Sequence, residues 1–500
     1  MTSIPLGGIR FLVEHRSPGP GGGPTLRVYD AEEGGHERLR FDCFQQQGHW
    51  HLDPAGADTV TLFDPGLESI GWTVDLLRHD FAGLAARANL PAPRVAADAL
   101  AAALDRIETL LRNPPLDLDA VRAADRHPSR GEKWALYPED VLPLWVADMD
   151  FPIADPIRRM LRFAVERSDV GYPIHPAPTD IGEITAARMR ERFGWTLDPA
   201  RVEVLCDVVQ GLAVSLLQFA EPGEGAVVQT PIYPPFLGNV RSTGRRLVEA
   251  PLAYGARGYE IDLDALAAKI DAGTRLVLIC NPHNPTGRVF RRNELDGIAE
   301  LALRHDLVVV SDEIHADLVY PGAHHVPFGS LSPEVAERTV TLTGASKAFN
   351  VAGLRCGLAI FGSEARHRRF NGLPRHARGG ISLLGFEAIR MAWLHAQPWL
   401  DQVLAYLQQN RDHVARFVAQ ELPGVRLHAP EGTYLAWLDC NALALEPSPY
   451  EFFLQRARVA LSDGPNFGTP GRGFVRINFA TSRAILGEAL ERMAKALRAR

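Results

Sequence analysis

The stretch TLTGASKAFNVAGLRCG, Thr341–Gly357, decides how this sequence is interpreted. It starts as an apolar, β-rich run and places Lys347 shortly after that run, with Arg355 eight positions later. A lysine is long, strongly hydrated and usually exposed, so one interpretation is a solvated loop residue. The other is a reactive amine presented at the end of a buried strand. The rest of the chain decides between the two.

Short runs rich in β-forming residues surround this stretch, and helix-length segments such as 294–306 separate them. Several of the runs are apolar almost throughout, as strands buried on both faces of a mostly parallel sheet are. This rhythm predicts a three-layer αβα domain. The runs cover residues 202–209, 225–230, 245–252, 275–281, 307–313, 339–344 and 356–362.

The chain before this α/β section has a different pattern. Residues 25–31, 38–44 and 49–53 alternate polar with apolar residues, as strands do. Residues 69–88 and 98–112 then show helical periodicity, and Pro114-Pro115 closes the section because a proline pair cannot continue a helix. The helical spacing in the second of these segments is carried by Leu100, Leu104, Ile107 and Leu111.

The last hundred residues predict one long helix over 398–422, then shorter strands and a final helix that ends at Arg500. We therefore expect three domains. They are an accessory α+β domain over 1–115, a large domain with an N-terminal arm over 116–400, and a smaller α+β domain over 401–500.

Composition limits the function. The chain has 500 residues, 46% of them hydrophobic, and no continuous apolar run long enough for a membrane span. A net charge of −7 without a long basic block argues against a nucleic-acid surface, so small molecules are the expected partners. The first residues lack the features of a signal peptide, which favours the cytoplasm. Five scattered cysteines suggest neither disulfides nor a cysteine metal site.

Unusual residues follow four of the predicted strands. They are Tyr233, Asn284, Asp312 with His315, and Lys347. In an open parallel sheet, ligands bind beyond the carboxyl ends of the strands, so these residues should lie close together. Each has a plain alternative: a core tyrosine, a turn asparagine, an aspartate that caps a helix, or an exposed lysine. The combination at successive strand ends weakens the plain alternatives.

From about Leu116 to Arg500 the sequence resembles the fold-type I pyridoxal-phosphate enzymes, the aspartate aminotransferase superfamily. Within it the chain is most similar to the MalY/PatB branch of cystathionine β-lyases. The motifs are LPLWVADMDF from Leu142, GYP from Gly171, TPIYPPF from Thr230, CNPHNPTGRV from Cys280, SDEIHADL from Ser311, SKAFNVAGL from Ser346, GTYLAWLD from Gly432 and GFVRINFATSR from Gly473.

The resemblance implies that the cofactor is pyridoxal 5'-phosphate. Lys347 would bind its aldehyde covalently and later move the Cα proton of the substrate. Asp312 would bind the pyridinium nitrogen, and Asn284 the phenolic oxygen, with His315 nearby. Tyr233 would stack on the ring.

The same resemblance assigns the anionic groups. Ser346 and Arg355 would hold the phosphate, together with the backbone amides of Val208 and Val209 at a helix N-terminus. Arg476 would bind the α-carboxylate of a small amino-acid substrate through its planar fork. Tyr172 would reach the phosphate of a neighbouring subunit, which implies a homodimer with a shared active site.

Three positions depart from the family pattern. Asp207 stands before the phosphate-binding helix, where relatives commonly have glycine. Pro234 replaces a second tyrosine. Arg355 is more typical of the wider aminotransferase group than of the best-known β-lyases. These departures put the phosphate contacts of Val208 and Val209 in question and keep transamination open.

The reaction depends on the fate of the carbanion that forms when the Cα proton leaves. A thiol on Cβ would leave, giving a thiol, pyruvate and ammonia, whereas its absence would favour transamination. A dicarboxylate transaminase would need a second arginine, which the sequence does not identify. We therefore favour a carbon-sulfur β-lyase acting on cystathionine or related cysteine-S-conjugates. The alternatives are an aminotransferase of class I/II and a regulatory protein that retains the cofactor fold.

No family is recognised for residues 1–115. His49 and His51 lie two apart on a predicted strand, with His36 upstream, and form a possible metal pair. No further ligand follows at a telling spacing, so surface histidines beside a half-buried Trp50 are the favoured interpretation, and we expect no metal site.

Overall fold

The computed structural model describes residues 1–16, 22–44, 48–64, 67–91, 96–173, 180–256, 258–374 and 378–500. These residues form two compact units. The first consists of Met1–Leu116 with the later segments Ala154–Asp169 and Leu394–Trp399, and the second contains the remaining chain.

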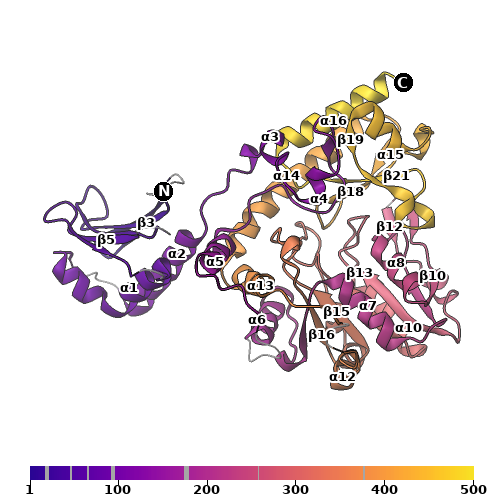
Figure 1. Cartoon of the computed structure of the whole chain (residues 1–500), viewed down its shortest axis with the longest axis horizontal. Coiled ribbons are helices and arrows are strands. Elements are labelled where there is room, and N and C mark those ends of the chain that lie inside the picture. The colour runs from indigo at the N-terminus through magenta and orange to yellow at the C-terminus, as the bar shows by residue number, and fades with distance from the viewer. Residues whose placement is uncertain are drawn as a thin grey trace. The chain divides into compact units, whose positions relative to one another are not determined.

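An antiparallel sheet forms the main part of the first unit (Figure 1), and its six strands are paired in chain order. Helices α1 (Ser69–Arg87) and α2 (Ala97–Arg112) follow it, and α5 (Asp155–Glu166) belongs to the same unit. The strands are β1 (Thr2–Leu6), β2 (Ile9–His15), β3 (Pro24–Tyr29), β4 (Glu37–Asp42), β5 (His49–Leu52) and β6 (Thr59–Leu62).

The core of the first unit forms between this sheet and the helices. Leu104, Ile107 and Leu111 of α2 are buried in one cluster with Phe11 and Phe41 of the sheet. The apolar stripe of α2 therefore packs on its own unit. The predicted α+β character of this section is confirmed.

The second unit is built around a seven-stranded sheet with the order β10-β9-β13-β14-β15-β16-β8. Neighbouring strands from β10 to β15 are parallel, and β16 is antiparallel to both of its neighbours. Each predicted run supplies one strand of this mostly parallel sheet. They are β8 (Val202–Leu205), β9 (Gly225–Val228), β10 (Arg246–Glu249), β13 (Thr274–Cys280), β14 (Val308–Asp312), β15 (Thr339–Thr343) and β16 (Gly357–Phe361).

Helices cover both faces of this sheet, which confirms the three-layer αβα prediction. Helices α7 (Val208–Phe219) and α8 (Pro234–Ser242) pack on one face through a core that includes Leu212 and Phe236. Helix α10 (Arg292–Arg304) packs on the other face through Leu295 and Ile298. Figure 1 shows α7 and α8 beside the strands in magenta.

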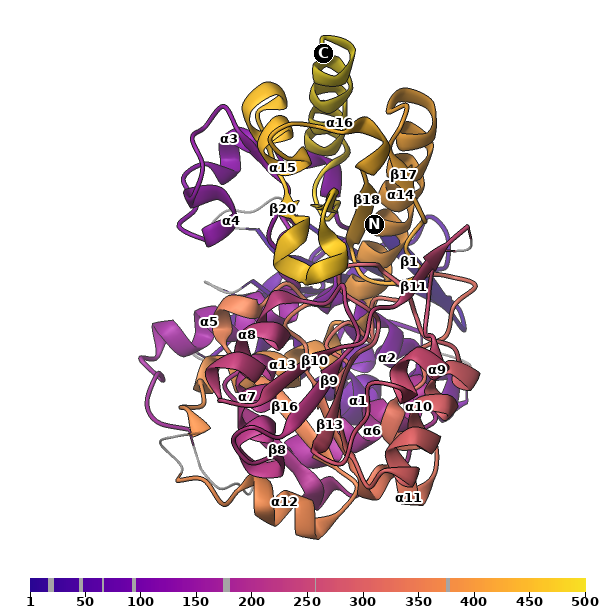
Figure 2. The same ribbon diagram turned by 90° about the vertical axis from the view of Figure 1, so that its right-hand side faces the viewer.

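A smaller antiparallel sheet with the order β17-β18-β21-β20 follows in the second unit. Figure 2 shows its strands with α15 and α16 at the top of the view and the larger sheet below. Its strands and helices are β17 (Arg426–Leu427), β18 (Leu435–Asp439), β20 (Ser462–Asp463), β21 (Phe474–Asn478), α14 (Gln397–Glu421), α15 (Pro449–Phe452) and α16 (Arg483–Arg498).

The other elements are short or connect these sheets. They are α3 (Ala123–Arg126), α4 (Glu132–Ala135), β7 (Leu142–Pro143), α6 (Ile181–Phe193), β11 (Ala253–Gly255), β12 (Gly258–Glu260), α9 (Leu263–Ala267), α11 (Pro333–Glu337), α12 (Glu364–Phe370), α13 (Leu383–His395) and β19 (Val459–Ala460). Across the described ranges, no helix combines the length and apolar character that crossing a membrane requires.

Candidate active site

Lys347 lies in the loop after β15, and its Nζ donates a hydrogen bond of 2.8 Å to the carbonyl oxygen of Ala147. Burial lowers the pKa of the Lys347 amine. The negative charge of Asp148 opposes this effect, and the charge of Arg476 adds to it. The amine is therefore easier to deprotonate than an exposed lysine, as a nucleophile or a proton acceptor requires.

The segment Trp145–Phe151 carries this acceptor, and side chains from two distant parts of the chain hold it in place. Asn478 Nδ2 donates to the carbonyl oxygens of Val146 and Asp148 at 2.7 Å each. Asn350 Nδ2 donates to those of Met149 at 3.1 Å and Phe151 at 2.9 Å. The position of the Ala147 carbonyl therefore depends on both the lysine loop and the smaller sheet.

Sequence reasoning assigned no role to this segment or to the two asparagines. Their motifs supported the family resemblance, but a backbone carbonyl is present at every residue and gives no signal in a sequence. The sequence did offer one signal for the two asparagines, because Asn350 and Asn478 are polar residues within otherwise largely apolar stretches.

Asp312 ends β14, which pairs with β15 in parallel. Its carboxylate is buried and accepts the backbone N–H of Ile314 at 3.0 Å. Burial raises the pKa of Asp312 to about 7, and the charge of Lys347 opposes that rise. A buried carboxyl of this kind gains from a cationic partner, which a protonated ring nitrogen would supply.

His315 lies in the loop beyond Asp312 and is also buried. Burial lowers its pKa to about 3, with the charges of Lys347 and Arg476 as further causes. Within the described residues, its Nδ1 is buried without a hydrogen-bond partner. An unsatisfied buried nitrogen is costly and is typical of a site that a ligand completes.

Arg476 is at the centre of β21 and is buried, although it remains a cation. Its Nη1 donates to Asn284 Oδ1 at 2.8 Å, and its Nη2 donates to the Trp145 carbonyl at 2.8 Å and to Ser462 Oγ at 3.0 Å. Burial lowers its pKa to about 10. No carboxylate of the described chain forms an ion pair with it, so its charge suits an incoming anion.

Tyr233 follows β9 and immediately precedes α8, with Pro234 as the first helical residue. Its ring packs against the apolar core that the sheet forms with α7 and α8, and burial raises the pKa of its hydroxyl. Proline suits the first position of a helix because its missing N–H would have no partner there. Pro234 therefore has a structural role as the first residue of α8.

The predicted phosphate site lies at the N-terminus of α7. Asp207 caps this helix, since its Oδ1 accepts the backbone N–H of Gln210 at 2.7 Å. The second oxygen of Asp207 pairs with Arg355, whose backbone is left-handed with φ of 56°. Val208 and Val209 open the helix, and Ser346 lies beside Lys347 in the loop after β15. An acid and an arginine therefore face each other where the phosphate is expected.

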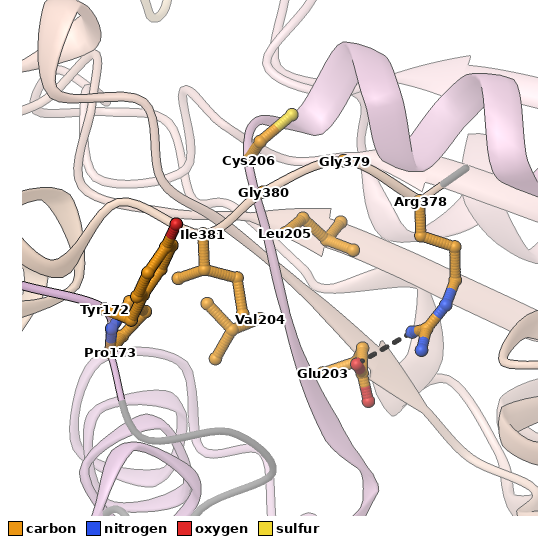
Figure 3. Close-up of a pocket in the computed structure, with 10 residues that line it drawn as sticks. All are labelled: Tyr172, Pro173, Glu203, Val204, Leu205, Cys206, Arg378, Gly379, Gly380 and Ile381. Atoms are coloured by element: carbon orange, nitrogen blue, oxygen red, sulfur yellow. Dashed lines mark hydrogen bonds and ion pairs between the residues drawn. The ribbon is translucent and has the colours of Figure 1, made fainter. Parts of the chain in front are cut away.

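Tyr172 is the predicted site residue that the structure places apart. Its side chain is fully exposed, and it lines a cavity of about 530 Å³ with residues 203–206 and 378–381. Figure 3 shows Tyr172 at one edge of this cavity and the ion pair between Arg378 and Glu203, 3.0 Å apart, at the other. Lys347 is not among the residues that line this cavity.

The fold and this site define a class. The family description "Aminotransferase class I and II" matches residues 173–493, and the chain belongs to this family. The expected fold-type I architecture is confirmed. A second description, a domain of unknown function named DUF7700, matches residues 3–111.

The names of individual relatives describe a narrower class of enzyme than the family description does. Cystathionine beta-lyase PatB of Bacillus subtilis strain 168 is 36% identical, over 72% of this chain and 93% of the relative. The cystathionine beta-lyase of Corynebacterium glutamicum is 37% identical, over 73% of this chain and 96% of the relative. The structure of cystalysin from Treponema denticola, which contains pyridoxal 5'-phosphate, superposes with a TM-score of 0.73 at 30% identity, covering 77% of this chain and 100% of that one.

Proposed function

We propose that this protein is a pyridoxal-phosphate-dependent C–S β-lyase. It cleaves cystathionine or a related cysteine-S-conjugate with one water molecule to a thiol, pyruvate and ammonia. One observation carries the proposal. The half-buried Lys347 amine, hydrogen-bonded to Ala147, lies close enough to Asp312 and Arg476 for their charges to act on its pKa. Relatives with names of this activity support the choice of reaction.

The residues present fit pyridoxal 5'-phosphate. Asp312 has a buried carboxyl suited to a cationic ring nitrogen, and His315 has a buried nitrogen without a partner among the described residues. Lys347 would hold the aldehyde carbon, Asn284 and Tyr233 the ring, and Ser346, Arg355 and the first amides of α7 the phosphate. When bound, the cofactor supplies an electron sink that makes the Cα proton of an amino acid acidic.

The chain's own groups would do the remaining work. Arg476 would bind the α-carboxylate, because its guanidinium is buried, charged and held by Asn284 and Trp145. Lys347 would take the proton from Cα, which its lowered pKa favours. The C–S bond then breaks as the electron pair moves to the sulfur, and the thiolate takes up a proton, for which the Lys347 ammonium is the donor, and leaves as a thiol.

Transamination is the second candidate, because the same lysine serves both reactions. A transaminase for dicarboxylates would need another cation for the distal carboxylate. The cations whose charges act on His315 are Lys347 and Arg476, and both already have roles in the proposed reaction. A substrate whose side chain has no net charge, such as the zwitterionic thioether arm of cystathionine, does not require a further cation.

We also propose a homodimer, in which the exposed ring of Tyr172 completes the site of the second subunit. The five cysteines all have free thiols, which supports a reducing, cytoplasmic location. Sedimentation of the purified protein should give the mass of two chains. A fully active monomer would show that Tyr172 is not needed to complete the site of a second subunit.

The decisive experiment incubates the purified, cofactor-loaded protein with cystathionine and measures pyruvate, ammonia and free thiol in parallel. Equal amounts of the three products are expected, and the Lys347→Ala protein should form none while keeping its fold. Release of a 2-oxo acid only when an acceptor keto acid is present would instead identify an aminotransferase. No reaction with any amino acid, from a protein that still binds the cofactor, would favour a regulatory role.

A further inference from the structure

The first unit contains a cluster of two imidazoles and a carboxylate that the lyase reaction does not use. His49 and His51 are on β5, and Asp42 is on the neighbouring strand β4. The antiparallel register places Asp42 directly opposite His49. The three side chains therefore share one face of the sheet, while Trp50 between the histidines packs on the opposite, core-facing side.

The spacing of this cluster matches the needs of a metal ion. Asp42 Oδ2 lies 3.3 Å from His49 Nε2 and 3.6 Å from His51 Nε2. The candidate ligand atoms all lie within 4.8 Å of one another. Bonds of about 2.1 Å at tetrahedral angles place neighbouring ligand atoms about 3.4 Å apart, so that small side-chain movements complete the geometry.

A second layer of contacts orients these ligands. Asp58 Oδ1 lies 2.6 Å from His51 Nδ1, which leaves Nε2 directed at Asp42. Thr25 Oγ1 donates to Asp42 Oδ1 at 2.7 Å, which leaves Oδ2 for the histidines. A carboxylate behind a metal-binding histidine and a donor behind a metal-binding carboxylate are the usual supports of such sites.

Arg40 competes for the same place. Its Nη2 lies 2.7 Å from His51 Nε2, and its Nε lies 3.2 Å from Asp42 Oδ2. The cluster therefore attracts a cation, which in this structure is a guanidinium. Arg40 also has Glu37 as a partner at 3.5 Å, so it can turn away and keep an ion pair when a metal enters.

We propose that Asp42, His49 and His51 bind a divalent first-row transition metal ion, with Zn²⁺ as the probe. Two imidazoles and one carboxylate form a three-ligand set that leaves a coordination position for water or a small ligand. His49 is partly exposed, so an ion can enter from solvent. Sequence spacing identifies no third ligand, because Asp42 meets the histidines only through strand pairing.

The test uses the full-length, cofactor-loaded protein after treatment with a chelator. Zn²⁺ is added, unbound metal is removed by gel filtration, and bound zinc is measured per chain. We expect one equivalent in the parent protein. The His49→Ala and His51→Ala proteins should each bind at least about 10-fold more weakly, and Asp58→Asn about 10-fold more weakly. Arg40→Met should bind more tightly because a competing cation is gone.

His36→Ala is the matched control, since this exposed histidine of the same unit lies outside the cluster. It should bind zinc like the parent. All variants should retain parental circular dichroism and lyase activity, which separates this site from the cofactor site. Co²⁺ in place of Zn²⁺ should give a visible spectrum that His49→Ala loses. Zinc binding that is absent, or unchanged in both histidine variants, would overturn the proposal.

Discussion

The hydroxyl of Tyr434 and the amine of Lys347 donate hydrogen bonds to one acceptor, the carbonyl oxygen of Ala147, each at 2.8 Å. A carbonyl oxygen has two lone pairs, so both bonds can form at once. The place of the reactive amine is thereby fixed against a backbone atom, and Tyr434 limits how that atom can move.

Tyr434→Phe should lower kcat for pyruvate formation about 3- to 10-fold, with little change in KM. A buried hydrogen bond is worth about 0.5–1.5 kcal/mol, and its loss loosens the acceptor of Lys347. Tyr320→Phe is the matched control, because Tyr320 is buried nearby and donates to Thr433 instead. Steady-state kinetics of both variants check this. An equal loss of kcat in the two would assign the effect to general destabilisation.

Arg476→Lys should raise KM for cystathionine about 10- to 100-fold and leave cofactor absorbance unchanged. An ammonium cannot reproduce the planar fork that binds a carboxylate through two parallel hydrogen bonds, each worth about 1.5–3 kcal/mol. The exposed pair of Arg458 with Asp140 offers the control, and Arg458→Lys should behave like the parent. A normal KM for Arg476→Lys would place the α-carboxylate elsewhere.

Asp207→Asn should tighten binding of pyridoxal phosphate about 2- to 5-fold. Asparagine caps a helix as well as aspartate does, so the change removes a charge near the expected phosphate and keeps α7 intact. Dialysis followed by fluorescence titration gives the dissociation constant. Asp198→Asn, which alters another capping aspartate, should leave it unchanged. Weaker binding by Asp207→Asn would mean that Asp207 serves to position Arg355.

The titration of Asp312 predicts a pH dependence for the protein stripped of its cofactor. Its folded pKa of about 7 lies above its ordinary value of 3.8, so the native state holds the proton more tightly. Its stabilising contribution is complete below about pH 4 and is lost as the pH rises to about 7, by about 4 kcal/mol at most.

His315 has the opposite slope, since its lowered pKa makes stability rise with pH. The effect of Asp312 is therefore measured as a difference. Urea unfolding of the parent and of Asp312→Asn is compared from pH 4 to pH 8. The free energy of unfolding of the parent, relative to that of Asp312→Asn, should fall steadily up to about pH 7. If this difference in free energy of unfolding instead grows with pH, the Asp312 carboxyl is ionised in the folded apoprotein.

Residues 1–115 are proposed to fold as a unit of their own, and Leu104→Ala tests this. Leu104 is buried in the core of the first unit, so truncation should cost that unit about 2–5 kcal/mol. A separate calorimetric transition should move to lower temperature, while lyase activity below it stays normal. Arg106→Ala, on the exposed face of the same helix, is the control. If lyase activity is lost together with the core of the first unit, the two units do not fold independently.

The large sheet was predictable because its strands are short and rich in β-forming residues, most of them are apolar, and stretches long enough for helices separate most of them. The strands β1, β2 and β6 of the first unit were not predicted. Ile9, Phe11 and Val13 of β2 alternate as buried residues, a signal that was present in the sequence and not used. The residues of β6 (TVTL) also alternate between polar and apolar, but all four are exposed, so the alternation there does not mark a buried face.

The site residues at strand ends could be found because motif and position agree there. Lys347, Asp312 and Asn284 belong to this group. The structure brings them together with Arg476, which lies at the centre of β21 and was assigned from the family resemblance alone. The Ala147 carbonyl could not be found, because only the folded chain shows which backbone atoms meet a side chain. The same holds for Asp42, whose contact with His49 depends on strand register.

Arg476 follows Lys347 by about 130 residues in the sequence. Its two partners Trp145 and Asn284 precede Lys347. At synthesis rates of about 5–20 residues per second, the lysine leaves the ribosome several seconds before the arginine that should hold the substrate. A growing chain thus contains Lys347 before it contains β21. The charge of Arg476 and the contacts of Asn478 with the Val146 and Asp148 carbonyls therefore act on the lysine site only when the chain is nearly complete.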